Sequence, residues 1–201
     1  MADIVHWIGE PVADGRVAEH RFNLVREAGI VPGILWLPGG IDHPRPPYPL
    51  VLLGHGGSGH KQATRQLSLA RWFAGGWYTA AVAIDGPFHG DRPHHDRMAD
   101  DWSATLNALI DLDLVDGSRV AYLGLSMGTR LGLPYVAAAG RGLRCAVQWN
   151  DELFPRAGQF ELFDRLGSPD KPLIAFPGTH RTAAPLAIRS WCEFIVDHLV
   201  A

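Results

Sequence analysis

The chain has 201 residues, of which 47% are hydrophobic, and this length and composition suit one soluble globular domain spanning residues 1–201. Its formal net charge is −3 and it has no basic tract, which argues against nucleic acid as a partner. We expect a cytoplasmic protein without a membrane partner, because no apolar run suits a membrane helix, the N-terminus lacks a signal-peptide plan, and the two cysteines show no metal or redox spacing.

Short apolar runs bounded by turn residues predict the strands of a sheet. Seven segments have this pattern: residues 17–26, 33–37, 50–55, 78–85, 119–125, 145–149 and 173–176. The first two are expected to form an antiparallel hairpin at one edge of the sheet. Two of the later ones, which contain "LVLLG" and "AAVAI", are apolar on both faces and are therefore typical of strands covered on both sides.

Stretches with helical spacing lie between the predicted strands. Apolar residues recur on one helical face from 102 to 110 and from 188 to 199, and Pro185 stands where a first helical turn accepts proline. Alternating strands and helices predict an α/β fold, a three-layer αβα sandwich around a mostly parallel twisted sheet.

The sequence "VAYLGLSMGT", residues 120–129, joins a buried-strand pattern to a serine between two glycines. In a strand–turn–helix context Ser126 lies at the sharp turn, while Gly124 and Gly128 stand where strand and helix approach closely. This geometry exposes the hydroxyl and directs the N–H of Met127 toward the same space. A glycine-rich turn with an incidental serine is the alternative, but the context favours a nucleophile.

A serine hydroxyl attacks poorly unless a histidine, oriented by a carboxylate, removes its proton. His180, in "PGTH" after the last predicted strand, is the only histidine between Ser126 and the terminal helix and is the candidate base. Asp151 follows the apolar run "CAVQW" after one intervening residue, Asn150, and is the candidate acid, with Glu152 as the fallback. The alternatives are a solvated loop for the histidine and a helix cap for Asp151.

Acyl transfer also needs hydrogen-bond donors for the oxyanion. The motif "LLGHGGSGHK" ends a core strand in glycines, whose bare backbone can approach a substrate. We assign the N–H groups of Gly57 and Met127 as the donor pair, with Ser58 N–H as the substitute for Gly57. His55 and His60 have no third ligand at a sensible spacing, so we predict structural hydrogen bonds for them rather than metal binding.

The motif "AIDGPFHGDRPHHDR" follows the next predicted strand. Asp85 and His89 are expected to brace the loops beside the nucleophile. A group of neighbouring side chains could be interpreted as a metal site: Asp91, His94, His95 and Asp96. Adjacent histidines cannot easily point at one ion, so we expect a solvated loop there and no metal.

Five motifs in order, "LVLLGHGGSGHK", "AIDGPFHGDR", "GLSMGTRLGLPY", "NDELFPRAGQFELFDRLGS" and "PGTH", together resemble the α/β-hydrolase superfamily. Within it they look most like the dienelactone-hydrolase-like serine esterases, from about residue 17 to the C-terminus. The resemblance implies Ser126 as nucleophile, Asp151 as acid and His180 as base, the positions already favoured by spacing. It also implies a cysteine nucleophile in dienelactone hydrolases proper, so the serine here points to esterase chemistry.

One departure from the family pattern lies between the helix of the nucleophile and the strand of the acid. Family members usually have a strand, a helix and often a cap there, whereas residues 140–151 have room for one strand. The fold should therefore be short of one strand–helix unit, either as a minimal member or through loss of a segment. The acid strand would then lie next to the Ser126 strand, and an apolar edge could be covered in a homodimer.

We therefore expect a serine hydrolase that cleaves small carboxylic esters through an acyl-enzyme, without a metal or organic cofactor. Lack of room for a large lid favours small soluble substrates, with Ser58, Phe88 and Phe154 as substrate-binding candidates. The same triad could instead cleave peptide amides or thioesters. The alternative from another class is a catalytically inactive α/β-hydrolase-like binding protein, because a lost strand could misplace Asp151.

Overall fold

The computed structural model describes residues 3–41, 43–92, 98–139, 145–165, 167 and 172–200. The chain divides into two compact units, Met1–Tyr135 and Val136–Ala201, and a single domain over the whole chain stays a prediction. In the part of the chain that is described, no helix has both the length and the apolar character needed to cross a membrane.

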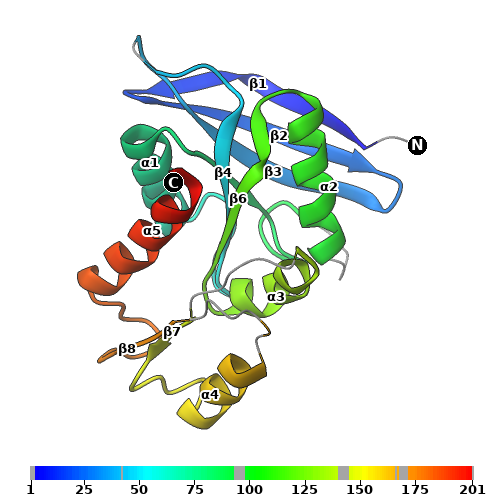
Figure 1. The fold of residues 1–201 in the computed structure, drawn as a ribbon. Coiled ribbons are helices and arrows are strands. Elements are labelled where there is room, and N and C mark those ends of the chain that lie inside the picture. Colours follow the sequence, from blue (N-terminus) through cyan, green and yellow to red (C-terminus); the bar gives the residue numbers. More distant parts are fainter. Residues whose placement is uncertain are drawn as a thin grey trace. The chain divides into compact units, whose positions relative to one another are not determined.

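A six-stranded mixed sheet forms the centre of the first unit (Figure 1). Its strands are β1 (Ile4–Asp14), β2 (Val17–Arg26), β3 (Gly29–Pro38), β4 (Tyr48–Gly54), β5 (Ala80–Ile84) and β6 (Val115–Gly124). Their spatial order is β1-β2-β3-β5-β4-β6. The pairs β1–β2, β2–β3 and β3–β5 are antiparallel, whereas β4 is parallel to both β5 and β6. The predicted antiparallel pairing of the first two strand candidates is therefore confirmed as β2–β3.

Strand β1 is the element that the sequence reasoning missed. Almost all of its residues are exposed, so it lacks the continuous apolar run of a buried strand. Its pairing with β2 also shifts in register between Ile8 and Val12, where Gly9 has a positive φ of 70°. Because β1 adds to the outer side of β2, the β2–β3 hairpin lies inside the sheet rather than at its edge, and that part of the prediction is wrong.

Helices cover both faces of this sheet. Helix α1 (Thr64–Trp77) packs against β3 and β5, and helix α2 (Met98–Asp111) packs against β6. Figure 1 shows them on opposite sides of β4 and β6. All seven residues of β4 are buried, because successive side chains point to opposite faces and both faces are covered. The α/β architecture inferred from these apolar runs is confirmed.

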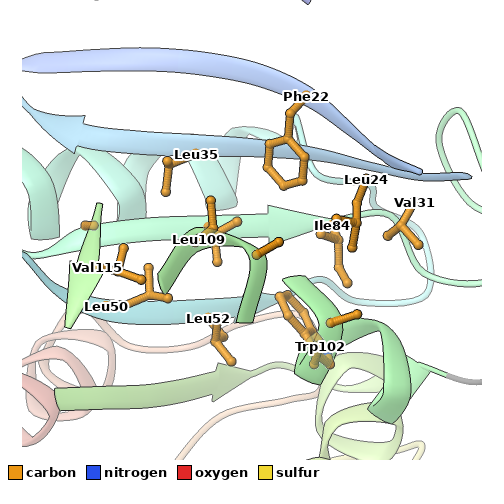
Figure 2. Packing of buried hydrophobic residues seen from close by; sticks show 14 of the residues in the cluster. Phe22, Leu24, Val31, Leu35, Leu50, Leu52, Ile84, Trp102, Leu109 and Val115 are labelled. Atoms are coloured by element: carbon orange, nitrogen blue, oxygen red, sulfur yellow. The ribbon is translucent and has the colours of Figure 1, made fainter. Parts of the chain in front are cut away.

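The main apolar core lies on the α2 side of the sheet (Figure 2). Trp102 and Leu109 of α2 are fully buried in the same cluster as Leu50 and Leu52 of β4. The ring of Trp102 meets Tyr122 of β6 edge to face, with 5.6 Å between the ring centroids. This core fixes β6, and with it the end of the strand that leads into Ser126.

We expect Leu109→Ala to lower the free energy of unfolding by about 2–5 kcal/mol, because the truncated side chain leaves a cavity between α2 and the sheet. Leu112→Ala is the matched control, since Leu112 is 45% exposed and its loss opens no cavity. Urea unfolding followed by tryptophan fluorescence compares the two. Equal destabilisation by both substitutions would contradict the placement of Leu109 in the core.

Helix α3 (Met127–Ala139) follows β6 directly, and only five residues separate its end from the next strand. So short a connection cannot hold a further strand and helix, in agreement with the shortened fold that the sequence predicts. The second unit contains β7 (Cys145–Gln148), α4 (Arg156–Arg165), β8 (Leu173–Phe176) and α5 (Pro185–Val200). Strands β7 and β8 pair in parallel. The expected place of β7 beside the Ser126 strand stays a prediction.

Candidate active site

The turn from β6 into α3 holds Ser126 in a strained backbone conformation. Its φ is 55°, in the left-handed region that few residues other than glycine adopt. Strand β6 ends at Gly124 and α3 begins at Met127, so the serine stands between strand and helix as "VAYLGLSMGT" predicts. A turn of this kind lifts a nucleophilic hydroxyl away from the end of the strand.

Close approach of β4, β6 and α3 explains the glycines around this turn. A Cβ added to Gly128 would collide with the carbonyl oxygen of Gly54, and one added to Gly124 would lie 2.8 Å from the amide nitrogen of Thr129. Side chains then fix the carbonyl groups of the turn. The hydroxyl of Tyr122 donates to the Gly128 carbonyl at 2.7 Å, and that of Thr129 donates to the Gly124 carbonyl at 2.8 Å.

The glycine loop after β4 lies beside the serine turn. A Cβ built on Gly56 would lie 3.9 Å from the Cβ of Ser126, and one built on Gly57 would lie 3.8 Å from the Cβ of Met127. The two residues predicted to donate to an oxyanion therefore belong to adjacent segments. Ser58, the predicted substitute, is exposed in the same loop.

His55 holds this loop through both of its ring nitrogens. Nδ1 donates to the carbonyl of Gly56 at 2.8 Å, and Nε2 accepts the N–H of Gly86 at 2.8 Å. Burial lowers the pKa of His55, which keeps the ring neutral and fits this tautomer. The Gly56 carbonyl also accepts the N–H of Gly59 at 3.0 Å. The Gly56–Gly57 peptide, which carries the Gly57 N–H, is thus anchored, and the structural role predicted for His55 is confirmed.

A buried ion pair ties the β4 loop to the loop after β5. Asp85 is fully buried and accepts the backbone N–H of Lys61 at 2.8 Å and its Nζ at 2.6 Å. The same Nζ lies 2.6 Å from the carboxylate of Asp91. His89 completes the connection, because its Nε2 donates to the carbonyl of Gly57 at 2.8 Å. The expected bracing of these loops by Asp85 and His89 is confirmed.

The residues considered as metal ligands have other partners or lie outside the described chain. Nδ1 of His60 accepts the N–H of Gln62 at 3.2 Å, and Asp91 pairs with Lys61. The rest of that cluster, His94, His95 and Asp96, lies outside the described residues. Within the residues that are described, no three His, Cys, Asp or Glu side chains gather closely enough to hold a metal ion.

Phe88, a predicted substrate-binding residue, stands in the loop after β5 with a φ of 62° and 71% of its surface exposed. Left-handed φ values are uncommon for aromatic residues and concentrate at functional sites. The binding roles of Phe88 and Ser58 stay predictions.

In the second unit, the pairing of β7 with β8 continues beyond both strands. The N–H of Asn150 donates to the carbonyl of Gly178 at 2.9 Å, past the last strand residues. Because parallel strands end on the same side, the segments that follow them emerge together. The segment after β7 carries Asp151, and the segment after β8 carries His180.

Asp151 meets the imidazole of His180 directly. The distance from Nδ1 of His180 to Oδ2 of Asp151 is 3.0 Å, and the side chain of Asp151 is only 8% exposed. Its other oxygen, Oδ1, accepts the N–H groups of Leu153 and Phe154 at 2.8 Å each. Burial raises the pKa of Asp151, but these hydrogen bonds outweigh it and leave the pKa below its ordinary value. The carboxylate is therefore charged at neutral pH.

Two further side chains surround His180. Glu152, the fallback acid, accepts the backbone N–H of His180 at 2.9 Å, so it holds the main chain of the histidine while Asp151 holds the ring. The ring of Phe154 lies against the imidazole, with 5.3 Å between the centroids. Each unit thus assembles its own part of the predicted constellation, and the catalytic roles stay predictions.

Comparison with known proteins gives no match among protein-family models or curated proteins. A solved structure of a cold-adapted esterase from an Arctic intertidal metagenomic library is 29% identical, with 96% of this chain and 99% of that chain covered and a TM-score of 0.84. A dienelactone hydrolase-like promiscuous phosphotriesterase from metagenomic libraries is 20% identical over 92% and 99% of the two chains, with a TM-score of 0.66. A serine hydrolase without a lid from Xanthomonas campestris is 15% identical, with 94% of this chain and 97% of that chain covered and a TM-score of 0.66.

The chain has the α/β-hydrolase fold. The resemblance inferred from the five motifs, to dienelactone-hydrolase-like esterases, is confirmed. The esterase at 29% identity supports a hydrolase of the carboxylic-ester type, and the two more distant structures share the fold.

Sequence reasoning missed several residues that hold the candidate site in place. Lys61 is one of only two lysines in the chain, and its place at the end of the glycine loop was a usable signal for a specific partner. Tyr122 gave no such signal, because one tyrosine in an apolar strand is ordinary core. The contact of Glu152 with the main chain of His180 could not be predicted either, because it depends on the register in which β7 pairs with β8.

Proposed function

We propose that this α/β hydrolase is a serine esterase that cleaves small carboxylic esters through an acyl-enzyme, with Ser126, His180 and Asp151 as its triad. The observation that carries the proposal is the strained turn at Ser126, with its φ of 55° between β6 and α3. The carboxylate–imidazole contact of 3.0 Å between Asp151 and His180 adds support, as does the 29% identity to an esterase.

In the proposed mechanism, Oγ of Ser126 attacks the ester carbonyl carbon while its proton passes to Nε2 of His180. Asp151 accepts the Nδ1–H and stabilises the imidazolium. The N–H groups of Gly57 and Met127 donate to the oxyanion of the tetrahedral intermediate. The imidazolium then protonates the leaving alcohol, and an acyl-Ser126 remains. Water, deprotonated by His180, attacks the acyl group and releases the acid, so the proposed steps require no metal or organic cofactor.

Three residues are proposed to contact the substrate. Ser58 follows the oxyanion donor Gly57, and the exposed ring of Phe88 belongs to the neighbouring loop, which His89 ties to Gly57. Phe154 lies against the proposed base. Short-acyl esters of small alcohols are the proposed substrate class.

The test combines covalent labelling with turnover. Wild-type protein is treated with a fluorophosphonate, digested and mapped by mass spectrometry, and we expect the label on the peptide that contains Ser126. Hydrolysis of p-nitrophenyl acetate and butyrate is measured beside a thioester and an aminoacyl amide, and the esters should be turned over fastest. Preference for the thioester or amide would reassign the bond that is cleaved. If the protein is not labelled and does not turn over any of these substrates, the result would favour the inactive binding protein.

A further inference from the structure

We propose that Glu152 is a positioning residue that anchors the main chain of His180, so that two adjacent carboxylates hold the histidine at two points. The inference rests on the proposed function, in which His180 is the base. Oε2 of Glu152 accepts the backbone N–H of His180 at 2.9 Å, while Oδ2 of Asp151 accepts from the ring at 3.0 Å.

The need for such an anchor follows from where His180 stands. Strand β8 ends at Phe176. The backbone hydrogen bond from Asn150 reaches Gly178, which lies two residues before the histidine. From there the segment leaves the ladder, so its position depends on side chains. One hydrogen bond to a ring orients the ring but does not fix the backbone that carries it. The Glu152 bond supplies that second constraint.

The neighbouring contacts show that the N–H of His180 is presented by an ordered turn. Thr182 donates its N–H to the carbonyl of Thr179 at 3.2 Å, and its hydroxyl oxygen accepts the N–H of Thr179 at 3.1 Å. These bonds close the turn around residue 180. On the opposite side, Asp151 binds the N–H groups of the residues that follow Glu152, so the glutamate projects from an ordered segment as well.

The charge of Glu152 strengthens the contact. The hydrogen bond from the His180 N–H holds the pKa of Glu152 below its ordinary value, so the carboxylate is ionised at neutral pH. A charged acceptor makes a shorter and stronger bond than a neutral one. Glutamine at this position keeps an acceptor oxygen and loses the charge, which makes it the informative conservative variant.

The experiment compares Glu152→Ala, Glu152→Gln and a control, Glu161→Ala, which removes an exposed glutamate that pairs with Arg165 one turn along α4. With p-nitrophenyl acetate we expect Glu152→Ala to lower kcat about 10-fold with KM within about 2-fold. Glu152→Gln should restore kcat to within about 3-fold of wild type, and Glu161→Ala should match wild type. Circular dichroism confirms that each variant is folded.

Amide hydrogen exchange of the His180 N–H, followed by NMR, provides a readout that does not need turnover. Exchange should be slow in wild type and Glu152→Gln and at least about 10-fold faster in Glu152→Ala. Unchanged exchange and unchanged kcat in Glu152→Ala would overturn the proposal, as would equal losses of kcat in the alanine and glutamine variants. If the wild type neither labels at Ser126 nor hydrolyses esters, the proposed function fails, and the exchange comparison alone decides whether Glu152 anchors the histidine.

Discussion

Ser126→Ala is expected to lower kcat/KM for short p-nitrophenyl esters by at least about 10⁴-fold and to abolish fluorophosphonate labelling. The alanine removes the only atom that forms the covalent bond in the proposed mechanism. We expect the fold to stay in place, since the close backbone approach at Gly124 and Gly128 and the hydroxyl–carbonyl bonds of Tyr122 and Thr129 shape the turn. Alanine has no better access than serine to a φ of 55°, so the backbone strain is unchanged.

A matched serine variant separates loss of the nucleophile from general damage. Ser103→Ala removes an exposed hydroxyl of α2 that donates to the carbonyl of Ala99, one turn earlier in the same helix. We expect this control to label and to hydrolyse esters like the wild type, while both variants keep their thermal unfolding midpoints within about 2 °C. Labelling of Ser126→Ala at the wild-type rate would show that another residue is the nucleophile.

The second large effect is expected from Asp151→Asn, which should lower kcat by about 10³–10⁴-fold. Oδ1 of Asp151 accepts two backbone N–H groups, so an asparagine oxygen can stay there and its NH₂ group then faces Nδ1 of His180. A donor in that place forces Nδ1 to act as an acceptor. The proton of the neutral ring moves to Nε2, the nitrogen that must take the proton of Ser126.

This prediction is checked by steady-state kinetics on the folded variant, with Asp197→Asn as control. Asp197 is an exposed carboxylate of α5, so the same chemical change there should leave kcat unaltered. Retention of wild-type kcat by Asp151→Asn would transfer the acid role elsewhere, and the sequence names Glu152 as the first residue to examine.

The parts of the fold that the sequence predicts well are those where one physical cause dominates. Strands β4 and β5 are buried on both faces, and a short uninterrupted apolar run between turn residues is typical of such strands. The serine turn is equally constrained, because glycine is required wherever a Cβ would meet backbone, as at Gly128. Strand β1 could not be found in this way, since its exposed residues are set only by pairing with β2.

For the candidate site, the sequence indicates which segments carry its residues, but not which atom contacts which. Asp151 and Glu152 are adjacent carboxylates after the same strand, and composition cannot decide between them. The decision depends on the register of β7 against β8 and on the turn in which Oδ1 of Asp151 binds the next two N–H groups. These are properties of the folded chain.

The ion pairs of Lys61 have a consequence for how the glycine loop after β4 responds to salt. Its ammonium group binds one carboxylate that is wholly inaccessible, Asp85, and one, Asp91, whose side chain is 76% exposed. Dissolved electrolyte screens charges in contact with solvent far more than those enclosed by protein. Rising ionic strength should therefore weaken the Lys61–Asp91 ion pair, while the Lys61–Asp85 ion pair persists. At high salt the glycine loop should stay anchored to Asp85 although its contact with Asp91 is lost.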